Sequence, residues 1–64
     1  MIKATVYGRT IDEYLNGYVD SRPVVGDVFV IYSGLSEWIL GHVENIDGDD
    51  YIIGGHTYKV VYSD

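Results

Sequence analysis

Residues 37–51, with the sequence EWILGHVENIDGDDY, restrict the folds open to this chain more than any other stretch. They predict one long strand, a tight acidic turn and the start of a second strand. In a regular strand, Ile39, Gly41 and Val43 point to one face. The opposite face then carries Trp38, Leu40, His42, Glu44 and Ile46. We expect a bend at Gly41, because a missing side chain lets another backbone come close or lets a sheet curl.

The chain is 64 residues long and contains no cysteine. A protein of this size buries only about 60% of the surface of its unfolded chain, and neither disulfides nor thiolate-bound metals can supplement the core here. No apolar run is long enough to span a bilayer, and the N-terminus lacks the basic and then apolar layout of a signal peptide. We therefore expect one small domain over residues 1–64, soluble and cytoplasmic.

The charge balance is strongly acidic, with ten acidic residues against four basic ones and a net charge of −6. Binding to nucleic acid needs clustered Lys and Arg, but Lys3, Arg9, Arg22 and Lys59 are spread along the chain. Anionic membranes should repel the protein. The charge favours a protein partner that is basic or carries a basic segment, although it is also explained by solubility alone.

Four further strands are predicted from short apolar or alternating runs between turn signals. They span residues 2–7, 28–32, 51–53 and 58–62. The continuous apolar run of residues 28–32 predicts burial on much of both faces, or a central strand in a curled sheet. With the long strand the count is five, and one irregular connection covers residues 8–25. This arrangement favours an all-β fold, either a small antiparallel barrel or a pair of packed sheets.

The connection carries two conflicting signals between residues 10 and 19. Thr10 and Glu13 fit a capping box before a short helical turn near residues 10–16, which Gly17 could end. Asn16-Gly17 is instead the strongest short cue for a hairpin turn. A helix of two turns is too short to persist without packing. We therefore favour an irregular hairpin and keep the helical turn as the alternative.

Five short motifs follow one another in the order typical of the SH3 family. They are Ala4-Thr5-Val6-Tyr7, the glycine–acid turn and apolar strand of residues 25–30, Glu37-Trp38-Ile39-Leu40-Gly41-His42, Tyr51-Ile52-Ile53 and Tyr58-Lys59-Val60. The chain thus resembles an SH3-like barrel over nearly its whole length. The resemblance implies a small five-stranded antiparallel barrel, in which residues 8–25 replace a long loop with Asp12 and Glu13 as its acids.

The resemblance also implies where a partner binds. Tyr7, Trp38 and Tyr58 match aromatic positions of the family's peptide groove, which grips polyproline ligands. Ile53 stands where the family has a proline, so this chain departs from that groove. Glu37 adds a carboxylate beside Trp38, whose position in the strand suits either a core residue or an exposed anchor. The predicted partner-binding residues are Trp38, Tyr7, Tyr58, Asp12, Glu13 and Glu37.

Catalytic and metal-binding patterns are missing from the sequence. Residues 47–50 cluster three carboxylates, but they lack the ligand spacing and the final bidentate Glu of a calcium loop. His42 and His56 could approach each other beside Glu44, yet no third His or Cys completes a zinc site. The serines lie in loops or at the terminus without a positioned base. We expect no enzyme activity, no cofactor and no bound metal.

These observations favour a non-catalytic protein–protein interaction module, or a small acidic inhibitor or regulator, that binds its partner through an aromatic, acid-rimmed face. Compact acidic proteins of this size include inhibitors encoded by phages and mobile elements, some of which imitate the charge of DNA. A different class of function is structural. A subunit of an assembly could associate with copies of itself through edge strands such as residues 58–62.

Overall fold

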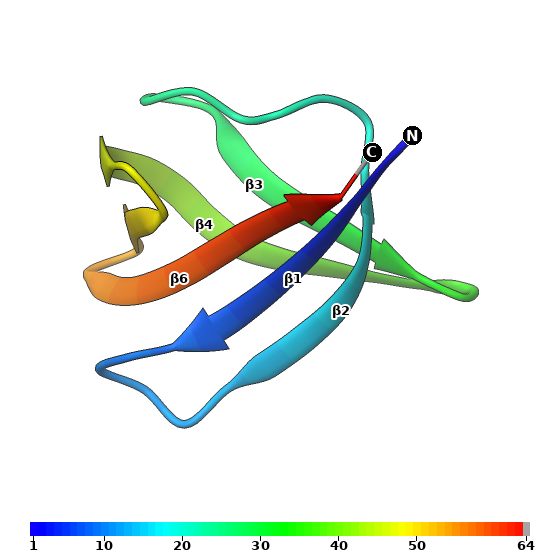
Figure 1. The fold of residues 1–64 in the computed structure, drawn as a ribbon, viewed down its shortest axis with the longest axis horizontal. Coiled ribbons are helices and arrows are strands. Elements are labelled where there is room, and N and C mark those ends of the chain that lie inside the picture. The colour runs from blue at the N-terminus through cyan, green and yellow to red at the C-terminus, as the bar shows by residue number, and fades with distance from the viewer. Residues whose placement is uncertain (64) are drawn as a thin grey trace.

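The computed structural model describes residues 1–63, which form six strands and no helix (Figure 1). The strands are β1 (Ile2–Gly8), β2 (Tyr14–Val19), β3 (Val28–Ser33), β4 (Ser36–Asp47), β5 (Asp50–Ile53) and β6 (His56–Ser63). Each strand pairs antiparallel with the next, and β6 pairs with β1 to close a barrel. The all-β antiparallel fold is confirmed, with six strands rather than five. The small closed barrel is compatible with an SH3-like fold.

The sixth strand, β2, arises where the sequence predicts a hairpin turn or a helix, and both predictions are wrong. Asn16 and Gly17 lie inside β2, opposite Thr5 and Ala4 of β1. The chain reverses earlier, at residues 9–13, where the Gly8 N–H donates to the Glu13 carbonyl over 2.7 Å. Pairing with residues 2–7 of β1 thus outweighs the preference of Asn-Gly for a turn. Gly17 instead allows β2 and β3 to approach closely, since a Cβ at this position would lie 2.2 Å from the Tyr32 carbonyl oxygen.

The core fills the interior of the barrel with alternate side chains of the strands. Its buried members are Ala4, Val6, Val19, Phe29, Ile31, Val43, Tyr51, Ile53, Tyr58 and Val60. Phe29 and Tyr51 pack edge to face with ring centroids 6.0 Å apart. The Tyr51 hydroxyl is hydrogen-bonded to the Tyr62 hydroxyl over 2.9 Å, so the polar tip of this buried ring has a partner.

The long strand β4 bends as predicted at Gly41, whose φ of 132° favours glycine. The register slips there and again between Val43 and Asn45. Each slip inserts one residue and exchanges the inner and outer faces of the strand. Ile39 is therefore 65% exposed while Val43 is buried, and the predicted shared face for these two residues is wrong.

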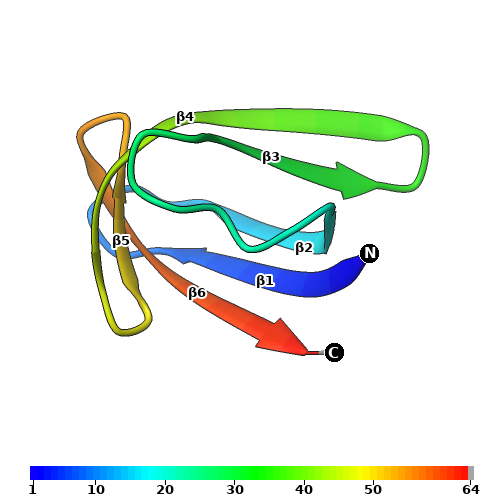
Figure 2. The same ribbon diagram turned by 90° about the horizontal axis from the view of Figure 1, so that it is seen from above.

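The hairpin formed by β3 and β4 projects from one end of the barrel, and the N-terminus lies at the same end (Figure 2). The short strand β5 lies at the opposite end. Residues 1–63 contain no helix that is long and apolar enough to cross a membrane.

Candidate functional site

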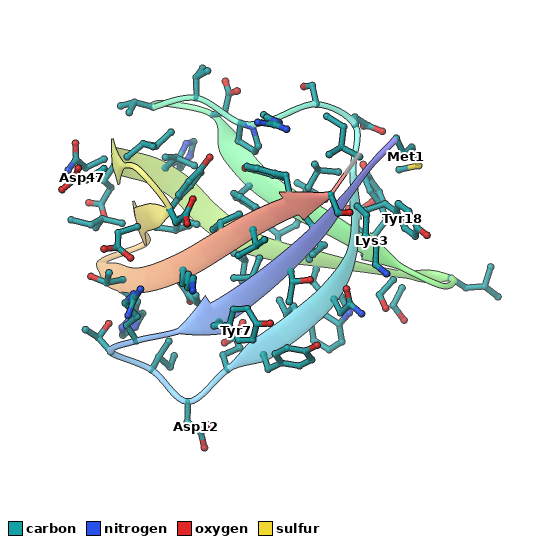
Figure 3. The ribbon with its side chains drawn as sticks, viewed as in Figure 1. Met1, Lys3, Tyr7, Asp12, Tyr18 and Asp47 are labelled. Carbon is teal, nitrogen blue, oxygen red and sulfur yellow. The ribbon has the colours of Figure 1, made fainter. Side chains whose placement is uncertain are left out.

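The residues predicted to bind a partner are distributed over both ends of the barrel. Tyr7 lies near the end of β1, far from the N-terminus, and faces outward (Figure 3). Its ring is tilted by 53° against that of Tyr14, with centroids 5.2 Å apart. Asp12 and Glu13 lie in the adjoining loop of residues 9–13. Tyr7, Asp12 and Tyr14 are exposed and Glu13 is half-buried, so the four residues form one aromatic and acidic edge of the molecule.

Trp38 lies at the other end of the barrel, close to the tip of the β3–β4 hairpin. It pairs across the ladder with the buried Ile31 and is itself 51% exposed, so it is neither fully core nor fully surface. Glu37 pairs with Tyr32 and points to the opposite face of the hairpin. The fold therefore does not bring Trp38 together with Tyr7.

Tyr58 is a core residue with only 3% of its surface exposed. Burial raises the pKa of its hydroxyl, and the negative charge of Glu13 raises it further. Its side chain is consequently not part of an exposed aromatic face. Tyr7, Trp38 and Tyr58 match a family groove in sequence, but they occupy three separate environments in this barrel.

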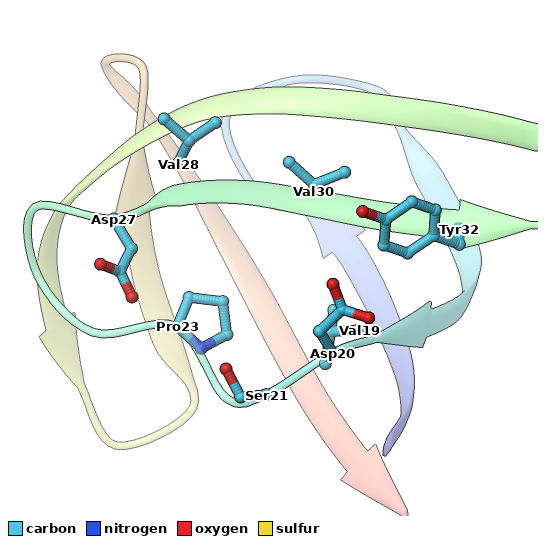
Figure 4. A pocket seen from close by; sticks show the side chains of 8 residues that line it. All are labelled: Val19, Asp20, Ser21, Pro23, Asp27, Val28, Val30 and Tyr32. Atoms are coloured by element: carbon cyan, nitrogen blue, oxygen red, sulfur yellow. The ribbon is translucent and has the colours of Figure 1, made fainter. Parts of the chain in front are cut away.

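A hollow of the described surface lies instead between β3 and the segment of residues 20–27 (Figure 4). We call it the β3 pocket. It is open to solvent and has a volume of about 290 Å³. Its lining residues are Val19, Asp20, Ser21, Pro23, Asp27, Val28, Val30 and Tyr32.

The floor of the β3 pocket consists of the outward side chains of β3. Val28, Val30 and Tyr32 alternate along the strand with Phe29 and Ile31, which are fully buried in the core. A strand with large apolar side chains on both faces has one apolar face left over once the barrel interior is filled. On β3 this outer face, formed by Val28, Val30 and Tyr32, is the apolar surface of the pocket.

Carboxylates flank this apolar floor at both ends. Asp27 precedes Val28, and its carboxylate points toward Pro23 and accepts a hydrogen bond of 3.1 Å from the Val24 N–H, whereas Asp20 lies beside Tyr32 (Figure 4). Glu37 stands opposite Tyr32 on β4, on the same outer face. The pKa of Tyr32 is raised, chiefly by the negative charge of Asp20, then by burial and by the charge of Glu37. The Tyr32 end of the pocket is therefore a region of negative potential.

Two of the four basic side chains make described contacts outside the pocket. Arg9 forms an ion pair with Asp50 over 2.7 Å, and the Arg22 guanidinium lies 4.9 Å above the Tyr62 ring. Lys3 stands opposite Tyr18 and Lys59 opposite Asp50. Within residues 1–63, no side chain forms an ion pair with Asp20, Asp27 or Glu37. The pocket thus presents carboxylates that lack cationic partners within the described chain.

The sequence does not predict the pocket, because a continuous apolar run such as residues 28–32 favours burial on much of both faces. The Asp directly before this run is the signal that could have indicated an outward apolar strip close to solvent. Asp20 carries no such signal. It reaches the pocket only because the segment of residues 20–27 folds back along β3 (Figure 2).

His42 and Glu44 lie within hydrogen-bonding distance of backbone groups. The His42 Nδ1 atom lies 3.3 Å from the Gly26 carbonyl oxygen, and the Glu44 carboxylate accepts a hydrogen bond of 2.6 Å from the Gly55 N–H. Over residues 1–63, no three His, Asp or Glu side chains are grouped as metal ligands.

No family model matches the chain, and neither a curated protein nor a solved structure shows significant similarity to it.

Proposed function

We propose that this chain is an SH3-like small barrel that acts as a non-catalytic protein-interaction domain and binds a basic segment of its partner at the β3 pocket. One observation carries the proposal. An apolar floor of Val28, Val30 and Tyr32 lies between carboxylates that have no cationic partner in residues 1–63.

The chemistry of this pocket complements lysine and arginine side chains. Both have an apolar stem that can cover Val30 and Tyr32, and both end in a cation that can approach Asp20 or Asp27. A volume of about 290 Å³ lies at the lower limit of small-molecule pockets, so it suits one or two side chains better than a cofactor. The net charge of −6 would also attract a basic partner over longer distances.

The proposal predicts that capture of a partner depends on the pocket acids in particular, and not on total charge. The test compares affinity capture by the wild-type chain with capture by a double variant, Asp20→Asn with Asp27→Asn. A matched control, Asp47→Asn with Asp49→Asn, removes the same charge from the exposed β4–β5 turn. The captured protein is then titrated with each purified variant.

We expect the pocket variant to weaken binding by roughly tenfold, since each exposed ion pair contributes about 0.2–1 kcal/mol. Added salt should weaken binding by the wild-type chain in the same direction. Equal affinities for the pocket variant and the control variant would refute the pocket as the binding site.

The predicted self-association through edge strands has less support. β6 pairs with β1 over residues 58–63 and with β5 over residues 56–59, so the unpaired edges are confined to two short stretches, residues 56–57 and 60–63. A charge of −6 on each copy also opposes close approach of identical chains. Sedimentation at two concentrations separates the two functions, because an assembly subunit would grow in mass with concentration.

A further inference from the structure

The geometry points to an extended ligand: the β3 pocket binds a segment of the partner with cationic side chains at positions i and i+4 and an apolar side chain at i+2. This inference rests on the proposed function and adds the conformation and the residue spacing of the bound segment.

The spacing follows from the floor of the pocket. Val28, Val30 and Tyr32 project to the same side of β3 at every second residue. Four residues of a strand span about 13 Å, so Val28 and Tyr32 are separated by the same distance as residues i and i+4 of any extended peptide. A ligand strand aligned with β3 therefore places three successive same-face side chains over these three residues.

The order of charges follows from what flanks each floor residue. At one end of the pocket lies Asp27, the residue before Val28, and at the other Asp20 and Glu37 stand on either side of Tyr32. The lining between these ends consists of Val30 and the buried Pro23, with no further carboxylate. A complementary segment therefore has a cation at each end and an apolar residue in the middle.

The extended conformation follows from the strand pairing around the pocket. On one side β3 pairs with β4 from Val28 to Ser33. On the other side, the described β2–β3 ladder consists of the single pair Tyr18–Tyr32. Residues 20–25 pass along the rest of β3 outside any strand, whereas the Gly26 N–H and the Asp27 carbonyl are hydrogen-bonded to the backbone of Val43 in β4. The residues that line the pocket extend along β3 from Asp27 to Tyr32 (Figure 4).

The test uses two capped five-residue peptides of identical composition, each with two arginines, two serines and one valine. The first has arginine at its first and fifth positions and valine at its third. The second has its arginines next to each other, so that they point to opposite faces of an extended chain. Each peptide is titrated into the full-length, isotope-labelled protein, and binding is followed by NMR at every backbone amide.

We expect the spaced peptide to bind about threefold more tightly, with the largest shifts at Asp20 and at residues 27–32. Asp20→Asn and Asp27→Asn should each reduce this preference, whereas Asp47→Asn, at the remote turn, should leave it unchanged. If the two peptides bind with equal affinity and the Asp20→Asn, Asp27→Asn variant binds neither, the proposed residue spacing is overturned and the proposed function is left intact. Shifts centred on residues 47–50, or no saturable binding of either peptide, would overturn the inference, and partner capture that ignores Asp20 and Asp27 would overturn the proposed function as well.

Discussion

Replacing Gly17 by Ala tests whether the seam between β2 and β3 depends on the close approach of two backbones. A Cβ at this position would lie 2.2 Å from the Tyr32 carbonyl oxygen and 3.2 Å from the Ile31 side chain. The nearer atom belongs to the backbone and cannot rotate away as a side chain would. The added methyl must therefore push β3 away from β2, where the described strands share only the pair Tyr18–Tyr32.

The magnitude can be bounded from general values. Inserting a methyl group into a packed site lowers the free energy of unfolding by about 1–3 kcal/mol. Ala in place of Gly inside a strand raises it by about 0.5–1 kcal/mol. A clash with a backbone atom belongs at the upper end of the first range, so we expect the free energy of unfolding to fall by about 2 kcal/mol. The whole domain is expected to have a stability of only about 3–10 kcal/mol.

Thermal denaturation followed by circular dichroism measures this loss. For 64 residues the entropy of unfolding is about 0.13 kcal/mol per kelvin, so a loss of about 2 kcal/mol lowers the melting temperature by roughly 15 °C. Asn16→Ala is the matched control. It removes only the exposed contact of 3.2 Å with the Thr5 hydroxyl and should change the melting temperature by a few degrees at most. A Gly17→Ala variant that melts with the wild type would refute the described contact between β2 and β3.

Three further substitutions separate the interior of the barrel from its surface. Tyr62→Phe removes the hydroxyl bonded to Tyr51 and should cost about 1 kcal/mol at neutral pH. Burial and this hydrogen bond raise the pKa of Tyr62 above its usual value of 10.0, so the wild type loses stability as pH rises above about 10, where the unfolded chain ionises first. Urea denaturation at pH 8 and pH 11 should show a smaller alkaline loss in Tyr62→Phe, and an equal loss would contradict the pKa shift. Trp38→Ala should lower the free energy of unfolding by about 1 kcal/mol or less, because half of the side chain is exposed, whereas Phe29→Ala should cost about 3–5 kcal/mol. A Trp38→Ala variant that unfolds like Phe29→Ala would assign Trp38 to the core.

The fold class was accessible from the sequence because alternation and turn residues are local signals. The strand at residues 2–7, the acidic turn before Tyr51 and the bend at Gly41 all appear as predicted. The errors occur where a distant strand decides the outcome. Asn16-Gly17 has the local chemistry of a turn, yet Thr5 and Ala4 of β1 hold it in a strand. The faces of β4 differ from those expected because two slips in register depend on pairing with β3 and β5.

The candidate site was less accessible, since its parts are separated in the chain. Asp20 and Glu37 flank the ring of Tyr32, but neither position has a pattern that links it to the strand of residues 28–32. The motif resemblance selected Tyr58, which the barrel buries in its core. Matching sequence motifs indicate the order of the strands, whereas the exposure of a side chain depends on which face of its strand points into the barrel.

The sequence by itself determined that this chain forms a small acidic all-β domain, because residue alternation, turn chemistry and charge are properties of the chain alone. Only the tertiary structure decided which apolar residues remain outside. Closing the barrel fills a limited interior with one face of each strand, and β3, which is apolar on both faces, then has Val28, Val30 and Tyr32 left on the surface. The fold of residues 20–27 brings Asp20 to that surface, and this arrangement turns a strand into the candidate binding site.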